Sequence, residues 1–224
     1  LWADRMSSHR NKYIKGTGMI YDIRHVNHFF NLTGIMHVGA FAGEELEAYR
    51  EIGLHNTVLF EPQPDLYDIV KNKCTCWEEV HNIALGSEPG EKEMYVSYRE
   101  GGVGMGSGAS SSLMKPKQHI TDHPSVHFKS DTIKVKVDIL DNYYKPEFNF
   151  LSIDVQGYEL EVLKGATNSL GGIDAMILEV NRAEVYEGCP MVEELDSFLK
   201  DFGFSRLSTR WQTKSWGDAL YAKD

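Results

Sequence analysis

Short apolar runs alternate with stretches of helical periodicity along this chain, and this alternation limits the folds it can adopt more than any other feature. Residues 34–38, 57–60 and 149–153 are short and apolar, and each is followed by a turn residue or an acid, as expected of buried strands. Residues 44–52 and 65–71 place their apolar side chains at helical spacing. Strands that alternate with helices predict an α/β fold with a mainly parallel sheet.

The rest of the chain continues this alternation until its last two strands. Further helices are predicted over residues 158–166 and around residues 192–199. Further strands are predicted over residues 80–85, 92–98, 132–137, 175–180, 203–208 and 219–222. No helical pattern separates the last two strands, so we expect them to form an antiparallel hairpin at one edge of the sheet.

The length of the chain, 224 residues, suits one domain with a well-buried core. We divide it into an N-terminal helical or irregular extension, residues 1–32, and a main domain, residues 33–224. Because the chain begins with Leu1 instead of Met, we interpret it either as a domain excised from a longer multidomain polypeptide or as a chain trimmed at its start. Its start is polar and basic and it has no run of about 18 apolar residues, which predicts neither a signal peptide nor a membrane span and favours a cytoplasmic protein.

The charge balance narrows the kinds of partner. The net charge is −10, and no basic cluster interrupts the acidic excess. Proteins that bind nucleic acid gain most of their affinity from Lys and Arg on phosphates, so we expect no nucleic-acid partner and a small or neutral ligand. The three cysteines cannot form a disulfide framework and are predicted to be free thiols.

The first candidate site follows the first strand. Five residues of the turn and of the helix start behind it are predicted to bind a cofactor: His37, Gly39, Ala40, Phe41 and Glu44. Ligands of doubly wound sheets bind at the carboxyl ends of the strands, where small residues let the backbone approach them. The free N–H groups of the following helix suit a carboxylate of the ligand. An ordinary tight turn would show the same glycines, so this motif is weak evidence alone.

Two further segments end the second and third strands. Glu61 and Pro62 follow the second strand, and the acid lies about 20 residues after Gly39, the spacing of a carboxylate that binds the hydroxyls of a ribose. Asn82 and Ala84 lie at the third strand, where small and apolar residues can flank an adenine ring. We therefore predict that these four residues also bind the cofactor.

A fourth segment ends a central strand in Asp154, followed by a glycine turn. This placement exposes the carboxylate in the crevice of the sheet, so Asp154 is also predicted to bind the cofactor, although an Asp here suits the cap of the following helix as well. Glu179 and Asn181 end the next strand and are expected to face the same crevice.

Together these segments resemble the FkbM family of S-adenosylmethionine-dependent methyltransferases. The chain is similar to members of this family in two short motifs. They are Phe-Glu-Pro-x-Pro, here residues 60–64, and Asn-x-Ala-Leu-Gly, here residues 82–86. A serine segment at residues 110–113 and a Leu-Asp at residues 140–141 follow. The block Ile-Asp-x-x-Gly-x-Glu-x-x-x-Leu-x-Gly-Ala, here residues 153–166, completes the resemblance.

The resemblance implies a Rossmann-like class I methyltransferase fold with a seven-stranded sheet, and S-adenosylmethionine as cofactor. It further implies an O-methyltransferase that acts on a hydroxyl of a sugar or glycan, with a carbohydrate or glycoside as acceptor and a fused or associated glycosyltransferase as partner. Two positions depart from the family, which often has Asp where His37 stands and Glu where Gln156 stands.

A sugar hydroxyl is a weak acid, so methyl transfer to it benefits from a general base or a metal. We assign catalysis to Asp154 and Glu179. The acceptor is assigned to Ser112, Gln156, Asn181 and Tyr186. A Mg²⁺ or Mn²⁺ ion, if one is used, would be held by the oxygen ligands of Asp154, Glu179 and Asn181. Proton removal by His37 or His81 is the alternative.

Two rival functions stay open. Tyr67 and Lys71 form the Tyr-x-x-x-Lys of NAD-dependent sugar-modifying enzymes, although no Gly-x-Gly-x-x-Gly follows the first strand. A methyltransferase-like binding module without activity is the other, suggested by the two departures. The glycine-rich residues 101–108 are predicted to be a lid over the acceptor, and Trp211 and Trp216 to be candidates for stacking on a sugar.

Overall fold

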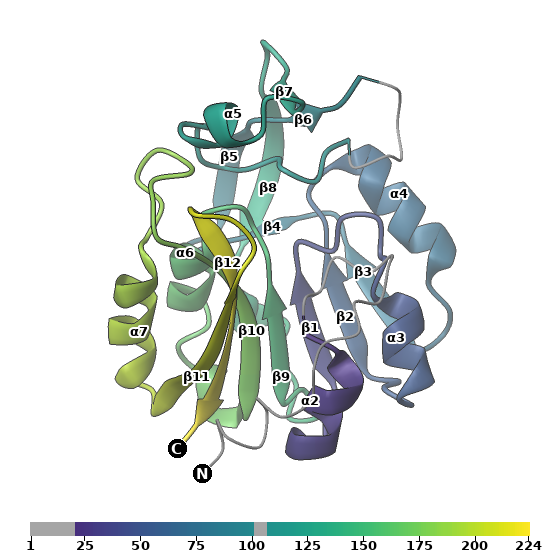
Figure 1. Cartoon of the computed structure of the whole chain (residues 1–224). Helices are drawn as coiled ribbons and strands as arrows, with labels where there is room; N and C mark the ends of the chain where they lie inside the picture. Colours follow the sequence, from purple (N-terminus) through teal and green to yellow (C-terminus); the bar gives the residue numbers. More distant parts are fainter. Residues whose placement is uncertain (1–20, 101–106) are drawn as a thin grey trace.

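The computed structural model describes residues 21–100 and 107–224, and a seven-stranded sheet forms its centre (Figure 1). In sheet order the strands are β11 (Phe204–Trp211), β12 (Trp216–Lys223), β10 (Ala175–Asn181), β9 (Phe150–Ile153), β1 (Ile35–Val38), β2 (Thr57–Phe60) and β3 (Glu78–His81). Strands β3, β2, β1, β9 and β10 are parallel, whereas β12 is antiparallel to both β10 and β11. The predicted mainly parallel sheet with its C-terminal antiparallel hairpin is confirmed.

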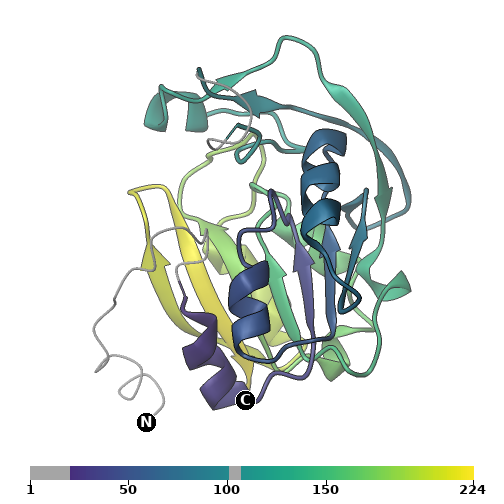
Figure 2. The ribbon, with the colours of Figure 1, turned by 90° about the vertical axis from the view of Figure 1, so that its right-hand side faces the viewer.

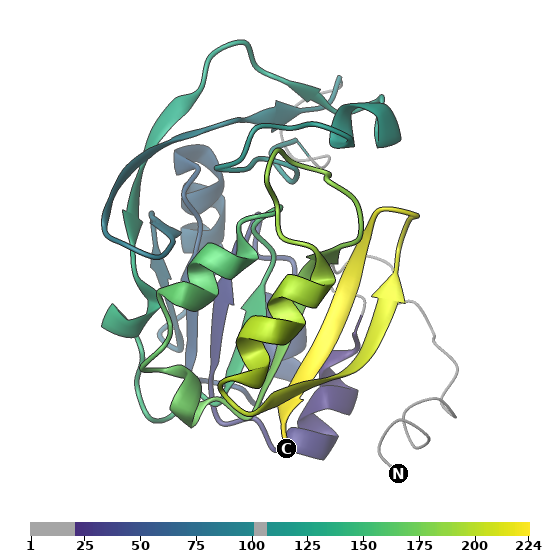
Figure 3. The same ribbon diagram turned by 90° about the vertical axis from the view of Figure 1, so that its left-hand side faces the viewer.

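Helices cover both faces of this sheet. The face seen in Figure 2 carries α2 (Ile23–Phe30), α3 (Leu46–Glu51) and α4 (Pro64–Lys73). The opposite face, seen in Figure 3, carries α6 (Glu159–Lys164) and α7 (Val192–Lys200). The helix starts fit their sequences, since Asp22 accepts a bond from the Arg24 N–H at the start of α2 and Pro64 opens α4.

The pleat of the central strands divides the core between the two faces. Met36 and Val38 of β1 pack with the α6 and α7 side, whereas Ile35 packs with α2 and α3. Each buried aliphatic side chain of this kind contributes roughly 1.5–3 kcal/mol. His37 alternates with these residues and is polar, so the upper part of the α2 and α3 face departs from a purely apolar core.

A smaller layer, which we call the cap, lies over the carboxyl ends of the parallel strands (Figure 1). It contains a three-stranded sheet of β4 (Ala84–Leu85), β8 (Ile133–Asp138) and β5 (Gly90–Met94). It also contains the pair β6 (Ser97–Tyr98) and β7 (His127–Phe128), and the short helix α5 (His119–Asp122). Two short 3-10 helices complete the fold, η1 (Leu140–Asn142) and η2 (Leu170–Gly172).

Two of the predicted strands are wrong, because each is divided between two sheets. Residues 80–85 do not form one strand, because β3 ends at His81 in the main sheet and β4 belongs to the cap. Residues 92–98 also divide, into the end of β5 and β6, which lie in different sheets. Apolar runs and the alternation of apolar with polar residues predict that a segment is extended. They do not show where a bend divides the segment into two strands.

Residues far apart in the sequence join the cap to the main sheet. The Trp216 indole N–H donates to Nε2 of His123 at 3.1 Å, and the Ser215 hydroxyl donates to the Asp122 carboxylate at 2.5 Å. Residues 1–20 of the predicted N-terminal extension lie outside the described part of the chain, and α2 behind them packs on the sheet through Ile23 and Val26. None of the helices that the structure describes is long and apolar enough to cross a membrane.

Candidate active site

A pocket of about 530 Å³ of open space lies between the carboxyl ends of β1, β2 and β9 and the underside of the cap. The predicted site residues that line it are Gly39, Phe41, Glu61, Pro62, Ala84, Ser112, Asp154 and Gln156. Most of the predicted cofactor segments therefore meet at one place, as the common edge of parallel strands requires.

The turn after β1 is built for close contact between two loops. Gly39 has a φ of +85°, and a Cβ on it would lie 1.9 Å from the carbonyl oxygen of Asp154. Only glycine fits here, which brings the end of β1 against the end of β9. The N–H groups of Gly39 and Ala40 both donate to the Phe60 carbonyl at 3.0 Å, so β2 anchors the same turn.

Glu61, at the end of β2, connects two loops of the pocket. One carboxylate oxygen accepts from the Phe41 N–H at 2.9 Å, and the other accepts from the Gln63 N–H at 2.9 Å. The side chain is buried, and this burial raises the pKa of Glu61 to about 7 although the backbone bonds favour the charged form. Because a carboxylate offers about four acceptor positions, it can still accept hydroxyl groups of a ligand.

Two amide side chains support the loop around Glu61. Asn82 donates from Nδ2 to the carbonyl oxygens of Glu61 at 2.9 Å and Pro62 at 3.1 Å, so it holds the loop without lining the pocket. Gln63 donates to the Gly108 carbonyl and accepts from the Ser111 hydroxyl, both at 3.1 Å. No sequence pattern singles out Gln63, because its partners Gly108 and Ser111 lie more than 40 residues further on.

Gln156 lies between the two predicted catalytic acids. Its Nε2 donates to Oδ1 of Asp154 at 2.7 Å and to Oε2 of Glu179 at 2.8 Å. Asp154 is open to the pocket, whereas Glu179 is buried behind it. Gln156 itself has a φ of +57°, a left-handed conformation that a side chain adopts only when its surroundings hold it there.

Burial shifts the pKa values of the two acids in the same direction but not to the same extent. Partial removal from water raises the pKa of Asp154, while the bonds from Gln156 and Glu179 lower it. Burial, together with the charge of Asp154, raises the pKa of Glu179 well above its usual range. Of the two acids, Glu179 is therefore the one whose protonated form is more strongly favoured, and Asp154 is the one that ionises more readily.

Two further buried acids lie beside this pair, and neither was predicted as a site residue. Glu159 accepts at Oε1 from the N–H groups of Val155 at 3.1 Å and Gly157 at 3.0 Å, and burial raises its pKa to about 7. Asp218 pairs with Glu179 across β10 and β12, and burial likewise raises its pKa to about 7. Glu159 belongs to the sequence block at residues 153–166, so a motif could have identified it. No motif contains Asp218, which reaches the site because β12 pairs with β10.

Four predicted site residues besides Ala40, Asn82 and Glu179 do not line the pocket. His37 is buried under α3, where its Nδ1 lies 3.1 Å from the Tyr49 hydroxyl, and burial lowers its pKa to about 4. Glu44 is exposed at the start of the helix region. Asn181 is fully buried, and its two polar atoms have no partner among the described residues.

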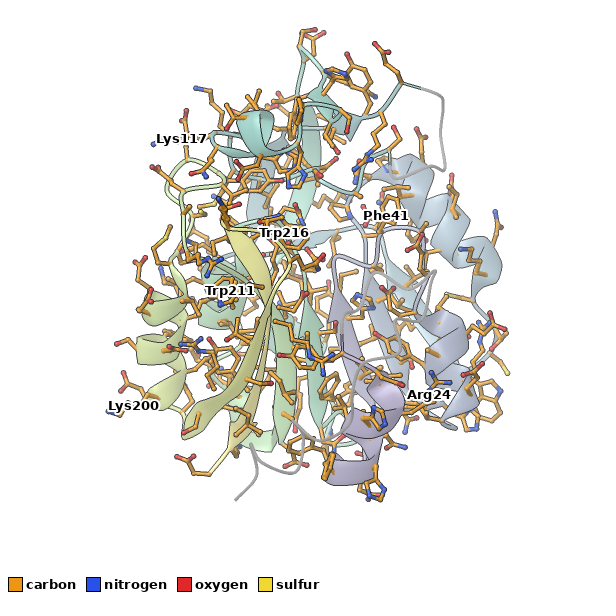
Figure 4. The ribbon with its side chains drawn as sticks, in the orientation of Figure 1. Arg24, Phe41, Lys117, Lys200, Trp211 and Trp216 are labelled. Atoms are coloured by element: carbon orange, nitrogen blue, oxygen red, sulfur yellow. The ribbon has the colours of Figure 1, made fainter. Side chains whose placement is uncertain are left out.

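Tyr186, the fourth, is also fully buried. Its hydroxyl lies 2.9 Å from both the Ser110 carbonyl and Oε1 of Gln156. The two tryptophans already have protein partners, because Trp216 bonds to the cap and the Arg182 guanidinium lies 4.3 Å over the ring of Trp211. Figure 4 shows Phe41 and Trp216 at the same end of the sheet, beneath the cap.

Two other predictions find no counterpart in the pocket. Lys71 Nζ lies 5.4 Å over the ring of Tyr67 on α4, and neither residue lines the pocket. Across residues 21–100 and 107–224, no group of three or more His, Cys, Asp or Glu is arranged to hold a metal ion. The predicted lid falls largely on residues 101–106, outside the described residues.

The sheet order, the antiparallel hairpin and the pocket at the strand ends together define a class I methyltransferase fold. The FkbM methyltransferase domain matches residues 37–206, and the chain belongs to this family. No curated protein matches the chain in sequence.

Solved structures agree on the fold at low sequence identity. An FkbM methyltransferase from Methylobacillus flagellatus is 15% identical, with a TM-score of 0.56 over 86% of this chain and 44% of that one. An uncharacterized protein from Listeria monocytogenes is 10% identical, with a TM-score of 0.50 over 92% of this chain and 68% of that one. The chain thus spans less than half of the Methylobacillus protein.

Proposed function

We propose that this chain is an S-adenosylmethionine-dependent O-methyltransferase that acts on a hydroxyl group of a sugar or glycan. The observation that carries this proposal is a single pocket in which a buried acid after β2 and an open acid after β9 both take part. Membership in the FkbM methyltransferase family supports the reaction class. The sugar acceptor and a glycosyltransferase partner rest on the sequence resemblance.

The residues of the pocket fit S-adenosylmethionine. Glu61 is a buried acceptor in the position suited to the ribose hydroxyls. The apolar side chains of Ile83, Leu85 and Leu113 line the same pocket and suit an adenine ring. The turn at Gly39 lets the backbone approach the methionine portion. His37 lies behind the pocket, buried under α3, and has the role of a support for this turn instead of a contact to the cofactor.

When bound, the cofactor supplies a sulfonium methyl group that a nucleophilic oxygen can attack. Asp154 accepts the proton of the acceptor hydroxyl, because it is open to the pocket and ionises more readily than Glu179. Burial of Glu179 favours its protonated form, which suits a group that lies behind the Asp154 carboxylate. The cap above the pocket, with Ser112, keeps water away from the oxygen that reacts.

A divalent cation does not fit between the two acids as they are arranged. The Gln156 amide nitrogen donates to both carboxyls, so it takes the position that a shared cation would need. An amide nitrogen is a donor and does not ligate Mg²⁺ or Mn²⁺, which prefer oxygen. The proposed mechanism therefore uses the protein acids alone.

Calorimetry of the purified protein tests the cofactor. We expect S-adenosylmethionine and S-adenosylhomocysteine to bind in the micromolar range and NADH not to bind. NADH binding without either methyl-cycle ligand would contradict the proposal and favour the NAD-dependent alternative. Cofactor binding with no methylated product on any glycoside or glycan acceptor would favour the inactive binding module.

A further inference from the structure

The side chain of Gln156 is fully committed to protein partners, although it lines the pocket. Its amide nitrogen donates one bond to Asp154 and one to Glu179, at 2.7 and 2.8 Å. Its amide oxygen accepts from the Tyr186 hydroxyl at 2.9 Å. With both N–H groups used, the amide has no donor left for a substrate.

The backbone of Gln156 is held as firmly as its side chain. The Ser112 hydroxyl donates to the Gln156 carbonyl at 2.7 Å and ties the loop to the cap. On the other side, Glu159 accepts from the N–H groups of Val155 and Gly157, the residues before and after Gln156. These bonds hold the left-handed φ of +57° at Gln156 and aim its side chain at the two acids.

The Asp154 carboxylate decides which way the Gln156 amide faces. The Tyr186 hydroxyl on its other side is buried, and its single proton lies between two carbonyl oxygens, those of Gln156 and Ser110. If the amide were turned over, its oxygen would face the Asp154 carboxylate, and the bond that Asp154 accepts from the amide nitrogen would be lost. The orientation with nitrogen toward the acids is therefore strongly favoured.

We propose that Gln156 is a positioning residue, whose amide fixes Asp154 and Glu179 in one arrangement and leaves the second Asp154 oxygen to face the acceptor. This inference rests on the proposed function and replaces the assignment of Gln156 to the substrate. The residue acts through Asp154, and Tyr186 acts through Gln156. The cap takes part, because Ser110 and Ser112 supply the bonds that hold Tyr186 and Gln156.

Carboxyl ¹³C signals of protein labelled at Asp and Glu test the arrangement without any acceptor. Asp154→Asn and Glu179→Gln assign the two signals. Gln156→Met keeps the length of the side chain and removes its three bonds, and Tyr186→Phe removes the hydroxyl that lies 2.9 Å from both the amide oxygen and the Ser110 carbonyl. We expect both variants to shift both signals. Asn72→Asp adds one charge at an exposed amide on α4 and serves as the unchanged control.

Kinetics then separate positioning from folding. With the best glycoside acceptor found for the wild type, Gln156→Met is expected to lower kcat about 10- to 100-fold. The dissociation constant of S-adenosylhomocysteine should stay within about threefold. In a double-mutant cycle, Tyr186→Phe should add little once Gln156 is Met, because it acts through that residue. Gln156→Asn, which keeps the amide but is shorter, should recover part of the loss.

Each failure has its own signature. Unchanged Asp154 and Glu179 signals in Gln156→Met would overturn the positioning role, whatever the activity. Equal loss of kcat and cofactor affinity, with additive effects in the cycle, would also overturn it and indicate a structural role alone. If the wild type transfers no methyl group to any acceptor while both signals shift as expected, the proposed function fails and the arrangement of the acids stands.

Discussion

Glu61→Gln tests the cofactor site with almost no change of shape. Each oxygen of the wild-type carboxylate accepts one backbone N–H, from Phe41 or from Gln63. In the variant, one of these N–H groups must face the new NH₂ group, which costs about 1–3 kcal/mol for an unsatisfied buried donor. A ribose hydroxyl also loses a bond to a charged acceptor, about 1.5–3 kcal/mol, which corresponds to an affinity roughly 10- to 150-fold weaker.

The assay is calorimetry with S-adenosylhomocysteine at two pH values. Because burial raises the pKa of Glu61 to about 7, the wild-type side chain is mostly ionised at pH 8 and mostly protonated at pH 6. The difference in affinity between wild type and variant should therefore be larger at pH 8. Asp68→Asn removes an exposed acid from α4 and should bind as the wild type does. Equal affinity of Glu61→Gln and wild type at pH 8 would refute the assignment.

Two further predictions concern stability. The buried acids Glu61, Glu159 and Asp218 have pKa values raised to about 7, so the folded chain binds more protons than the unfolded chain up to that pH, and the free energy of unfolding falls as pH rises. The buried histidines have pKa values lowered to about 4, so their effect on the free energy of unfolding has the opposite sign, and it falls mainly below about pH 6.5. Urea titrations should therefore show a loss of about 1–2 kcal/mol in the free energy of unfolding between pH 6.5 and 7.5. A rise over this range would contradict the burial of the acids. Gly39→Ala should cost more than about 3 kcal/mol, because it adds a clash with the Asp154 carbonyl to the strain of φ +85°. Gly53→Ala, at φ +74° with nothing within 4 Å of the added Cβ, should show the strain alone, and equal melting temperatures would contradict the close contact.

The sequence predicts most of the fold because the signals involved are local. The apolar run before Gly39 and the acid at Glu61 suffice to place the ends of β1 and β2, and topology then brings them together. Glycines at strand ends predict sharp turns in the sequence, and their positive φ values confirm those turns in the structure. The methyltransferase fold was therefore predictable from patterns a few residues long.

The finer parts of the site depend on contacts between distant residues. His37 has the right position in its motif, but the pleat of β1 turns its side chain under α3 instead of into the pocket. Asp218 enters the acid cluster through its pairing with Glu179 in β10 and β12. The amide of Gln156 could be given a role only when its partners were visible, since Glu179 and Tyr186 lie 23 and 30 positions away.

O-methylation with Asp154 as the base is measured by the transfer of a labelled methyl group from S-adenosylmethionine to glycosides with free hydroxyls, by wild type and by Asp154→Asn. We expect the wild type to label at least one acceptor on oxygen. Asp154→Asn should slow this transfer by about 10²- to 10⁴-fold, the usual contribution of a general base, while the cofactor still binds. Transfer by Asp154→Asn at the wild-type rate, or methylation on nitrogen alone, would contradict it.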